Sequence, residues 1–269
     1  MLKKKNSTKT NINLGTPERF GYAWNIASKI KAVNEYQFLN WTKVIKNKNY
    51  WKGKDILDAG CGIGRNTYWP ISYGAKSAVA FDMDDRTLKA AKNNLENYKN
   101  VKIEKHSIYE IPYANKFDIS FSIGVVHHLE FPNKAISELV KSTKPGGKVL
   151  VWLYGYENME TYVTILNPIR KILFSKAPLP FVRIISYIPT FFLFIYIWSG
   201  FSKLEYFKLL RKLKFSEIQQ IVFDQMLPKT AKYYKKNEAL TLLEHPELYD
   251  HKIEWVNECS WTVMATKKN

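Results

Sequence analysis

The stretch Asp55-Ile56-Leu57-Asp58-Ala59-Gly60-Cys61-Gly62-Ile63-Gly64 indicates the fold of this 269-residue chain. An apolar run leads into an acid and three glycines at every second position, which lets a backbone turn sharply off a strand and approach a ligand closely. The pattern predicts a strand, a nucleotide-cofactor loop and a helix that begins at about Arg65. A dinucleotide-binding G-x-G-x-x-G motif needs a third glycine at position 65, where arginine stands, so NAD is disfavoured.

Alternating strand and helix patterns continue after this loop. The segment 77–82 is a short apolar strand that ends in Asp82, and Asp84 or Asp85 then begins an amphipathic helix over 86–98. Lys144-Pro145-Gly146-Gly147 predicts a turn into a strand over 148–154. A last helix is predicted over 237–244, closed by His245-Pro246. The remaining strands are predicted over 101–105, 117–124, 252–256 and 260–266.

These elements resemble, in order and in motifs, the class I S-adenosylmethionine-dependent methyltransferases. The D-x-G-C-G-x-G-R run at 58–65 is similar to motif I of that family, and the resemblance covers roughly residues 50–155. It implies an α/β, Rossmann-like fold whose seven-stranded, mostly parallel sheet ends in an antiparallel hairpin. It also implies an enzyme that uses S-adenosylmethionine and releases S-adenosylhomocysteine.

The resemblance implies a set of cofactor-binding residues. An acid at the second strand tip can accept both ribose hydroxyls, which makes Asp82 the ribose candidate. Family members usually carry an aspartate for the adenine amino group where this chain has Ser107, and a hydroxyl accepts the same bond without charge assistance. The expected set is Asp58, Gly60, Cys61, Gly62, Gly64, Arg65, Asp82, Met83, Ser107, Ile108, Ile123 and Gly124.

The acceptor end is less clearly marked. Methyl transfer is an in-line displacement with a neutral thioether leaving group, so alignment is the enzyme's main task and a general base helps only some acceptors. His127 or His128, at the fourth strand tip, is the predicted base, unless one of them merely hydrogen-bonds the loop. Asp224 is a further catalytic candidate. The aromatic residues Tyr22 and Trp24 either close over the sulfonium or pin an N-terminal helix on the domain. Substrate contacts are expected from Tyr22, Trp24, Tyr154 and Tyr233.

The segment after the fifth strand is apolar and flanked by basic residues. Nineteen uncharged residues, 184–202, lie between Arg183 and Lys203, and Pro189 interrupts them. Such a segment forms a packed apolar cap, a lid that touches membrane or a lipid substrate, or a membrane span. We therefore divide the chain into a helical N-terminal extension (1–50), a cofactor-binding core (51–155), an apolar and basic, mainly helical insertion that roofs the acceptor (156–215) and a C-terminal part of the core (216–269).

Composition limits the class of acceptor. The net charge of +17 lies mainly outside the core, with +8 in residues 1–50 and +6 in 151–215, and only 6 of 41 basic residues are arginine. Scarce arginine disfavours a nucleic-acid acceptor, although the charge keeps that alternative open beside a non-catalytic cofactor-binding protein. We expect a small-molecule or lipid-like acceptor, with membrane surface contact through 184–202. Two cysteines suit neither a metal cluster nor disulfides, and Met1–Leu14 has no signal-peptide pattern, so a cytoplasmic location, peripheral to a membrane if 184–202 touches one, is expected.

Overall fold

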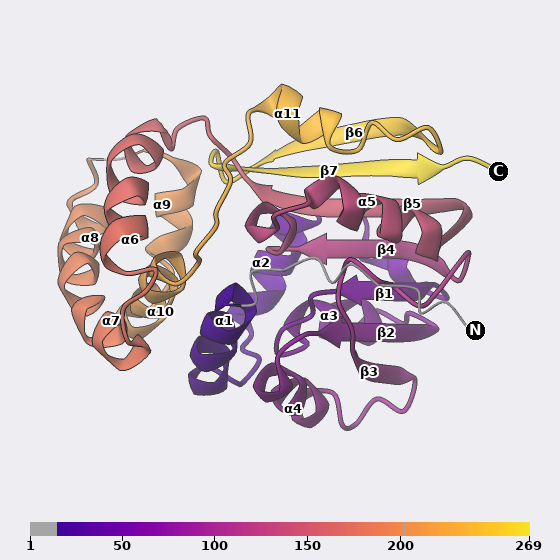
Figure 1. Ribbon diagram of the computed structural model, residues 1–269, viewed down its shortest axis with the longest axis horizontal. Helices are drawn as coiled ribbons and strands as arrows, with labels where there is room; N and C mark the ends of the chain where they lie inside the picture. The colour runs from indigo at the N-terminus through magenta and orange to yellow at the C-terminus, as the bar shows by residue number, and fades with distance from the viewer. Residues whose placement is uncertain (1–14, 202) are drawn as a thin grey trace, which may run out of the picture.

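The computed structural model describes residues 15–201 and 203–269. The expectation about a signal peptide concerns Met1–Leu14, which lie outside the described residues. Seven strands form one sheet with the order β3-β2-β1-β4-β5-β7-β6. Neighbours among β1 to β5 pair in parallel, and β7 runs antiparallel to both β5 and β6. The predicted fold class is therefore confirmed (Figure 1). The strands are β1 (Asp55–Ala59), β2 (Ser77–Asp82), β3 (Val101–Lys105), β4 (Phe117–Ile123), β5 (Thr143–Tyr154), β6 (Leu248–Val256) and β7 (Ser260–Lys267).

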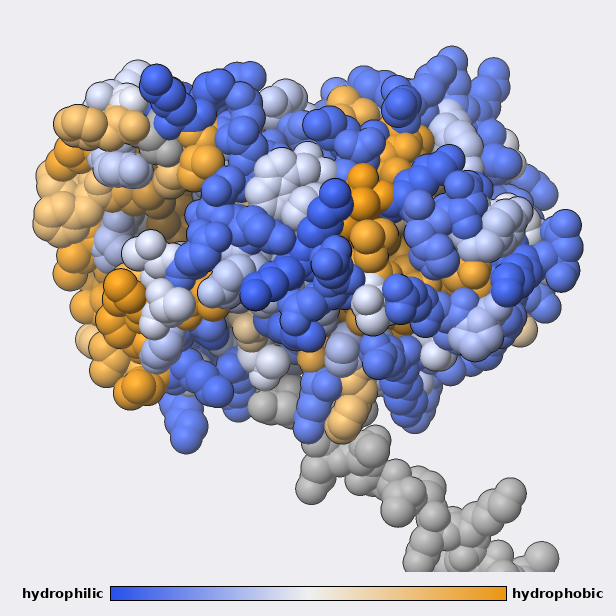
Figure 2. All heavy atoms as spheres, turned by 90° about the horizontal axis from the view of Figure 1, so that it is seen from above, coloured by the Kyte–Doolittle hydropathy of each residue, from blue (hydrophilic) through white to orange (hydrophobic). Residues whose placement is uncertain are grey.

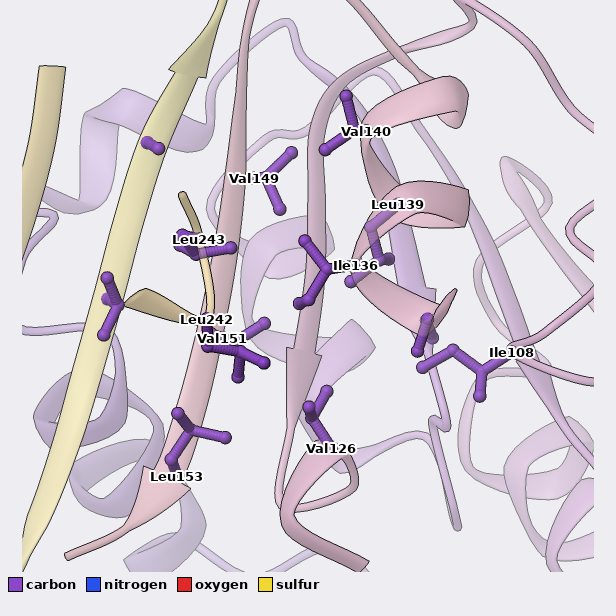
Figure 3. Close-up of a cluster of buried hydrophobic side chains, with 14 of the residues drawn as sticks. Ile108, Val126, Ile136, Leu139, Val140, Val149, Val151, Leu153, Leu242 and Leu243 are labelled. Atoms are coloured by element: carbon purple, nitrogen blue, oxygen red, sulfur yellow. The ribbon is translucent and has the colours of Figure 1, made fainter. Parts of the chain in front are cut away.

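Helices cover both faces of the sheet. On one face, α5 (Pro132–Ser142) begins with proline at its first position and turns Ile136, Leu139 and Val140 onto Val149 and Val151 of β5, as Figure 3 shows. The helix α11 (Lys236–Thr241) adds Ala239 to the same core. The other face packs on α2 (Val33–Trp41), the short 3₁₀ helix η1 (Lys48–Trp51) and α3 (Arg65–Ser72). Burial of these apolar side chains on both faces explains why the central strands are almost wholly apolar.

Four element boundaries differ from the predictions by three residues or more. The helix α11 ends at Thr241 rather than at 244, and β6 begins at Leu248 rather than at 252. The helix α4 (Asp85–Asn94) begins after Asp84, whose side chain caps it, but it ends four residues before Tyr98. Asparagines at its end are weak helix formers, and residues 95–98 close as a turn instead. The strand β5 begins at Thr143 rather than Lys148, because Thr143 already pairs with Phe117 and the glycine turn is absorbed as an irregularity in the ladder.

The segment after β5 is helical, as predicted. It forms the π-helical turn η3 (Tyr162–Leu166), α6 (Asn167–Leu173), α7 (Leu179–Ile185), α8 (Tyr187–Ser199), α9 (Glu205–Leu210) and α10 (Phe215–Met226). Figure 1 shows these helices together beyond the carboxyl ends of β1, β2 and β4, with α1 (Gly15–Ile26) between them and the sheet. Ligands of such sheets bind at this edge, so α1 and the helical segment form the walls of the candidate site.

Candidate active site

The glycine loop after β1 is shaped by its contacts. Gly60 has a φ of +84°, and a Cβ built there would lie 2.5 Å from Val125 Cγ2, so only glycine fits. Gly62 also has a positive φ, +53°, but a Cβ there would meet no atom within 4 Å. The loop therefore presents bare backbone to open space at Gly62, which is the kind of cradle a cofactor occupies.

Asp82, at the end of β2, holds this loop. Its Oδ2 accepts the N–H of Gly62 at 2.9 Å, and its Oδ1 accepts the N–H groups of Met83 and Asp84 at 2.7 and 3.2 Å. Burial raises the pKa of Asp82, and these three backbone donors oppose that rise. Oδ1 accepts two of these bonds and Oδ2 one, so Oδ2 keeps a free lone pair for the ribose hydroxyls predicted for this side chain.

Asp58 lies beneath the loop rather than beside a ligand. Its side chain is wholly buried, Thr67 Oγ1 donates to Oδ2 at 2.7 Å, and Oδ1 has no partner in the described part of the chain. Burial raises the pKa of Asp58 to about 7, against the smaller opposing effect of the Thr67 hydrogen bond. Asp58 thus ties β1 to α3, and its carboxyl is protonated below about pH 7.

A cavity of about 320 Å³ runs from the glycine loop to the helical segment after β5. Gly60, Gly62, Asp82, Met83 and Ile108 line its cofactor end. Toward the insertion it is walled by rings and aliphatic side chains from β5, α9 and α10 and from the loop before α11, namely Trp152, Tyr154, Tyr206, Leu209, Leu210, Ile221 and Tyr233. The wall is largely apolar and carries a few polar groups, which is the usual composition of a small-molecule binding site.

Helix α1 closes one side of the cavity and is fixed at both flanks. Gly21 lies against Asp84, where a Cβ would come within 2.1 Å of the carboxyl carbon, so the helix packs tightly on the start of α4. Arg19, which is 8% exposed, donates to three carbonyl oxygens, of Leu227, Ala177 and Phe174, at 2.9, 3.0 and 2.7 Å. This arginine ties α1 to the insertion, and Phe20 and Trp24 of the same helix line the cavity.

Two opposite charges face each other across the cavity. The Arg65 guanidinium, at the start of α3, lies 4.5 Å from the ring centre of Trp24 and 4.9 Å from that of Trp41. Burial lowers its pKa to about 10, and Asp224 of α10 is the charge that most opposes this change. Burial raises the pKa of Asp224 to about 7, against the attraction of Arg65 and a hydrogen bond from Gln220. The pair thus provides a guanidinium that stays charged at neutral pH and a carboxyl that titrates near pH 7, within one largely apolar chamber.

The two histidines of η2 (Val126–His128) occupy different environments. His128 lines the cavity, and its Nδ1 lies 2.9 Å from the Thr230 carbonyl oxygen, so Nδ1 carries the proton and Nε2 keeps its lone pair. Burial lowers the pKa of His128 to about 4. His127 is fully buried and its ring stacks on that of Tyr154 at 3.7 Å, and neither ring nitrogen has a hydrogen-bond partner in the described chain. The prediction named His127 or His128 as the base, and the structure leaves His128 as the candidate, because the turn of η2 directs His127 behind Tyr154.

Most of the predicted site residues line the cavity. Five do not: Asp58 and His127, described above, and Gly64, Ser107 and Tyr22. Gly64 caps α3 and packs on Leu95, Ser107 accepts the Tyr109 N–H through its hydroxyl, and Tyr22 packs on Phe223. Ser107 is thus occupied by its own turn, and Tyr22 pins α1, which was the structural alternative. The predicted residues that line the cavity are Gly60, Cys61, Gly62, Arg65, Asp82, Met83, Ile108, Ile123, Gly124, His128, Asp224, Trp24, Tyr154 and Tyr233.

Sequence reasoning missed several lining residues. Trp41 comes from α2, Trp152 from β5, and Tyr206 from α9, all without a motif to mark them. Gln225 is also missed, although it follows Asp224 directly. Its Nε2 donates to the Tyr154 hydroxyl at 2.9 Å, which links α10 to the tip of β5. Consecutive residues of a helix point to different faces, so the sequence carries no signal that both polar residues reach the same chamber.

Comparison with known proteins agrees with this geometry. Residues 57–151 match the family model described as "Methyltransferase domain". A tRNA U34 carboxymethyltransferase of Klebsiella pneumoniae is 29% identical over 128 residues, which are 46% of this chain and 38% of that one. The chain thus matches less than two-fifths of the length of this curated relative.

Solved structures share the fold over most of the chain. A SAM-dependent methyltransferase from Aquifex aeolicus has a TM-score of 0.51 at 17% identity, covering 85% of this chain and 92% of that one. Human N-acetylserotonin methyltransferase, solved with SAM, has a TM-score of 0.54 at 13% identity and covers 94% of this chain and 56% of that one. Residues 57–151 therefore match a methyltransferase domain, and the chain shares the class I, Rossmann-like fold of SAM-dependent methyltransferases. Its cofactor is S-adenosylmethionine.

Proposed function

We propose that this protein transfers the methyl group of S-adenosylmethionine to a small-molecule or lipid-like acceptor with a largely apolar body. The observation that carries the proposal is the wall of the cavity beyond the glycine loop. Tyr154, Tyr206 and Tyr233 line it with aliphatic residues of α9 and α10, and α1 closes it from the side. An enclosed chamber of this composition favours an acceptor that leaves water on binding.

The residues fit the cofactor at the end nearest β1 and β2. The bare backbone at Gly62 and the Asp82 carboxylate suit a ribose and its neighbouring atoms, and Met83 and Ile108 offer an apolar flank for the adenine. Arg65 can pair with a carboxylate and Asp224 with an ammonium group, so their opposed charges suit the amino-acid end of the cofactor. When bound, the cofactor supplies an electrophilic methyl group on a sulfonium.

The chain's own residues align the acceptor and accept its proton. The aromatic wall excludes water and orients the acceptor for in-line attack, which is where most of the rate enhancement arises. For a hydroxyl or other weakly acidic acceptor, His128 Nε2 takes the proton, because its lone pair is free and its ring is fixed by the Thr230 carbonyl. Gln225 and Tyr154 form a hydrogen-bonded pair that can contact a polar atom of the acceptor.

A nucleic-acid acceptor is the second candidate, because the Klebsiella pneumoniae relative is named for tRNA. Its match to this chain spans 128 residues, less than half of the chain, while the cavity wall is built largely from segments after β5. We favour the small acceptor on this ground. The protein then works in the cytoplasm, where S-adenosylmethionine is available.

The experiment uses methyl-labelled S-adenosylmethionine with two acceptor pools, a cell lipid and metabolite extract and a mixed tRNA preparation. We expect label in the extract and none in tRNA. The matched variants are Tyr233→Ala and Tyr249→Ala, the second of which removes an exposed tyrosine outside the cavity. Label that appears only in tRNA, or label transfer unchanged by Tyr233→Ala, contradicts the proposed acceptor.

A further inference from the structure

The outer end of the helical segment is an exposed apolar surface, here termed the apolar face. It consists of the exposed large apolar side chains between Ile165 and Phe201, fifteen in number, whereas the rest of the described chain has five. Phe201 is 83% exposed, Ile172 77%, Ile184 69% and Phe192 66%. Figure 2 shows them gathered on the end of the molecule formed by α6 to α8. Soluble monomers rarely expose an apolar patch of this extent, so the face is built for an interaction.

The opposite side of the same helices is packed on the domain. Val182 of α7 lies in a cluster with Phe223 of α10, Ser186 Oγ accepts a hydrogen bond from Gln219 at 2.7 Å, and Ile197 of α8 contacts Ile218. By length and composition alone, Leu179–Ser199 could cross a membrane. Because one side is held by α10, only the outer side is free to meet lipid. The arrangement is that of a helix lying in an interface rather than a span.

The segment that forms the apolar face also carries a net positive charge. Residues 161–204 contain no aspartate or glutamate but include five basic residues. Arg170 is buried against the Pro228 carbonyl, while Lys171, Lys176 and Lys203 are exposed and Arg183 is partly exposed. Lys171, Lys176, Lys203 and Arg183 form no ion pair within residues 15–201 and 203–269. Uncompensated cations beside exposed aromatic and aliphatic side chains complement an anionic, apolar-cored partner.

We propose that the apolar face docks on an anionic lipid bilayer, with its aromatic and aliphatic side chains inserted to the headgroup boundary and its lysines on lipid phosphates. A second copy of the chain is the main competing occupant. Two such faces would bring their basic residues together without any acid between residues 161 and 204 to pair with them, so self-association is electrostatically opposed. This inference concerns binding alone and does not depend on the methyl acceptor.

Flotation with vesicles tests the docking. Wild-type protein is mixed with neutral phosphatidylcholine vesicles and with vesicles containing about one-third phosphatidylglycerol, at low and high salt. We expect binding to the anionic vesicles that falls at least tenfold as salt screens the lysines, since the Debye length shrinks from about 10 Å to about 3 Å between 0.1 and 1 M salt. Phe192→Glu and Lys171→Glu should each weaken binding at least threefold. Tyr249→Glu, an exposed residue outside the apolar face, should leave it unchanged.

Two further readouts keep the test decisive. Thermal unfolding checks that each variant is folded. The fluorescence of Trp198, which is 60% exposed, is obtained by subtracting the signal of Trp198→Phe from that of the wild type, and it is measured with vesicles that contain brominated lipid. Quenching of this component supports insertion. Protein that stays in the soluble fraction with both vesicle types overturns the proposal. Dimers in sedimentation that persist at high salt and lack vesicle binding also overturn it, and they assign the face to a second copy.

Discussion

Because Asp58 is buried, its ionisation should make the free energy of unfolding depend on pH, and the substitution Asp58→Asn should remove that contribution. Burial raises its pKa from an ordinary 3.8 to about 7. Between these two values the unfolded chain has lost the proton and the folded chain still holds it. The folded state therefore binds more protons in this range, and Asp58 lowers the free energy of unfolding as pH rises.

The magnitude follows from the width of that window. About three pH units at about 1.4 kcal/mol each give a cost of roughly 4 kcal/mol, fully developed above about pH 7. Asparagine has nearly the same shape and no proton to lose, and its oxygen can still accept from Thr67. About two of these three units lie between pH 5 and pH 8, so we expect the free energy of unfolding of Asp58→Asn, relative to wild type, to rise by about 2.7 kcal/mol over that range.

The assay is urea unfolding of both proteins at pH 5, 6, 7 and 8, so that every other titrating group cancels in the difference. Asp55→Asn is the matched control on the same strand. Lys144 and Ser77 hold the pKa of Asp55 below its usual value against burial, so this carboxyl stays ionised throughout and its difference from wild type should be constant. Parallel wild-type and Asp58→Asn curves would refute the reasoning.

Three other changes test the site. Gly60→Ala should destabilise the fold by at least about 1 to 2 kcal/mol, because alanine there adds backbone strain in the left-handed region and a clash with Val125. Gly62→Ala should add only the backbone strain but should abolish cofactor binding. Thermal unfolding measures the stability of each variant, and calorimetry measures its cofactor binding. Arg19→Ala should raise the KM for S-adenosylmethionine at least fivefold with a smaller change in kcat, since α1 loses three carbonyl contacts, and steady-state kinetics measures the split. His128→Gln should slow single-turnover transfer to a hydroxyl acceptor by about 100-fold, or about 2.7 kcal/mol, because the pKa of His128 is about 4 and its ring is therefore neutral and able to accept the proton above about pH 5.

The cofactor half of the site could be predicted because local backbone demands mark it. Gly60 and Gly62 are visible in sequence because their left-handed φ values suit glycine, and Asp82 because it ends an apolar strand. The succession of strands and helices along the chain follows from the alternation of apolar patterns, whereas the mostly parallel sheet was expected from the family resemblance. The role of Ser107 could not be predicted in this way. Its hydroxyl accepts the N–H of Tyr109 within a turn, and only the three-dimensional structure reveals that contact.

The acceptor half depends on packing between distant segments. His127 and His128 are adjacent and chemically identical, and only the turn of η2 places one in the cavity and the other behind Tyr154. Trp41 reaches the cavity because α2 packs beside the start of α3, for which the sequence contains no motif. Contacts of this kind are set by tertiary packing, which local patterns do not encode.

The most direct test of the central claim is a calorimetric titration of S-adenosylhomocysteine into wild-type protein and into Asp82→Ala. We predict one saturable site per chain in the wild type. In the variant we expect affinity lower by about 30- to 160-fold, as loss of a charge-assisted pair worth roughly 2 to 3 kcal/mol implies. Equal affinities in the two proteins, or no binding to either, would contradict the assignment of this cavity to the cofactor.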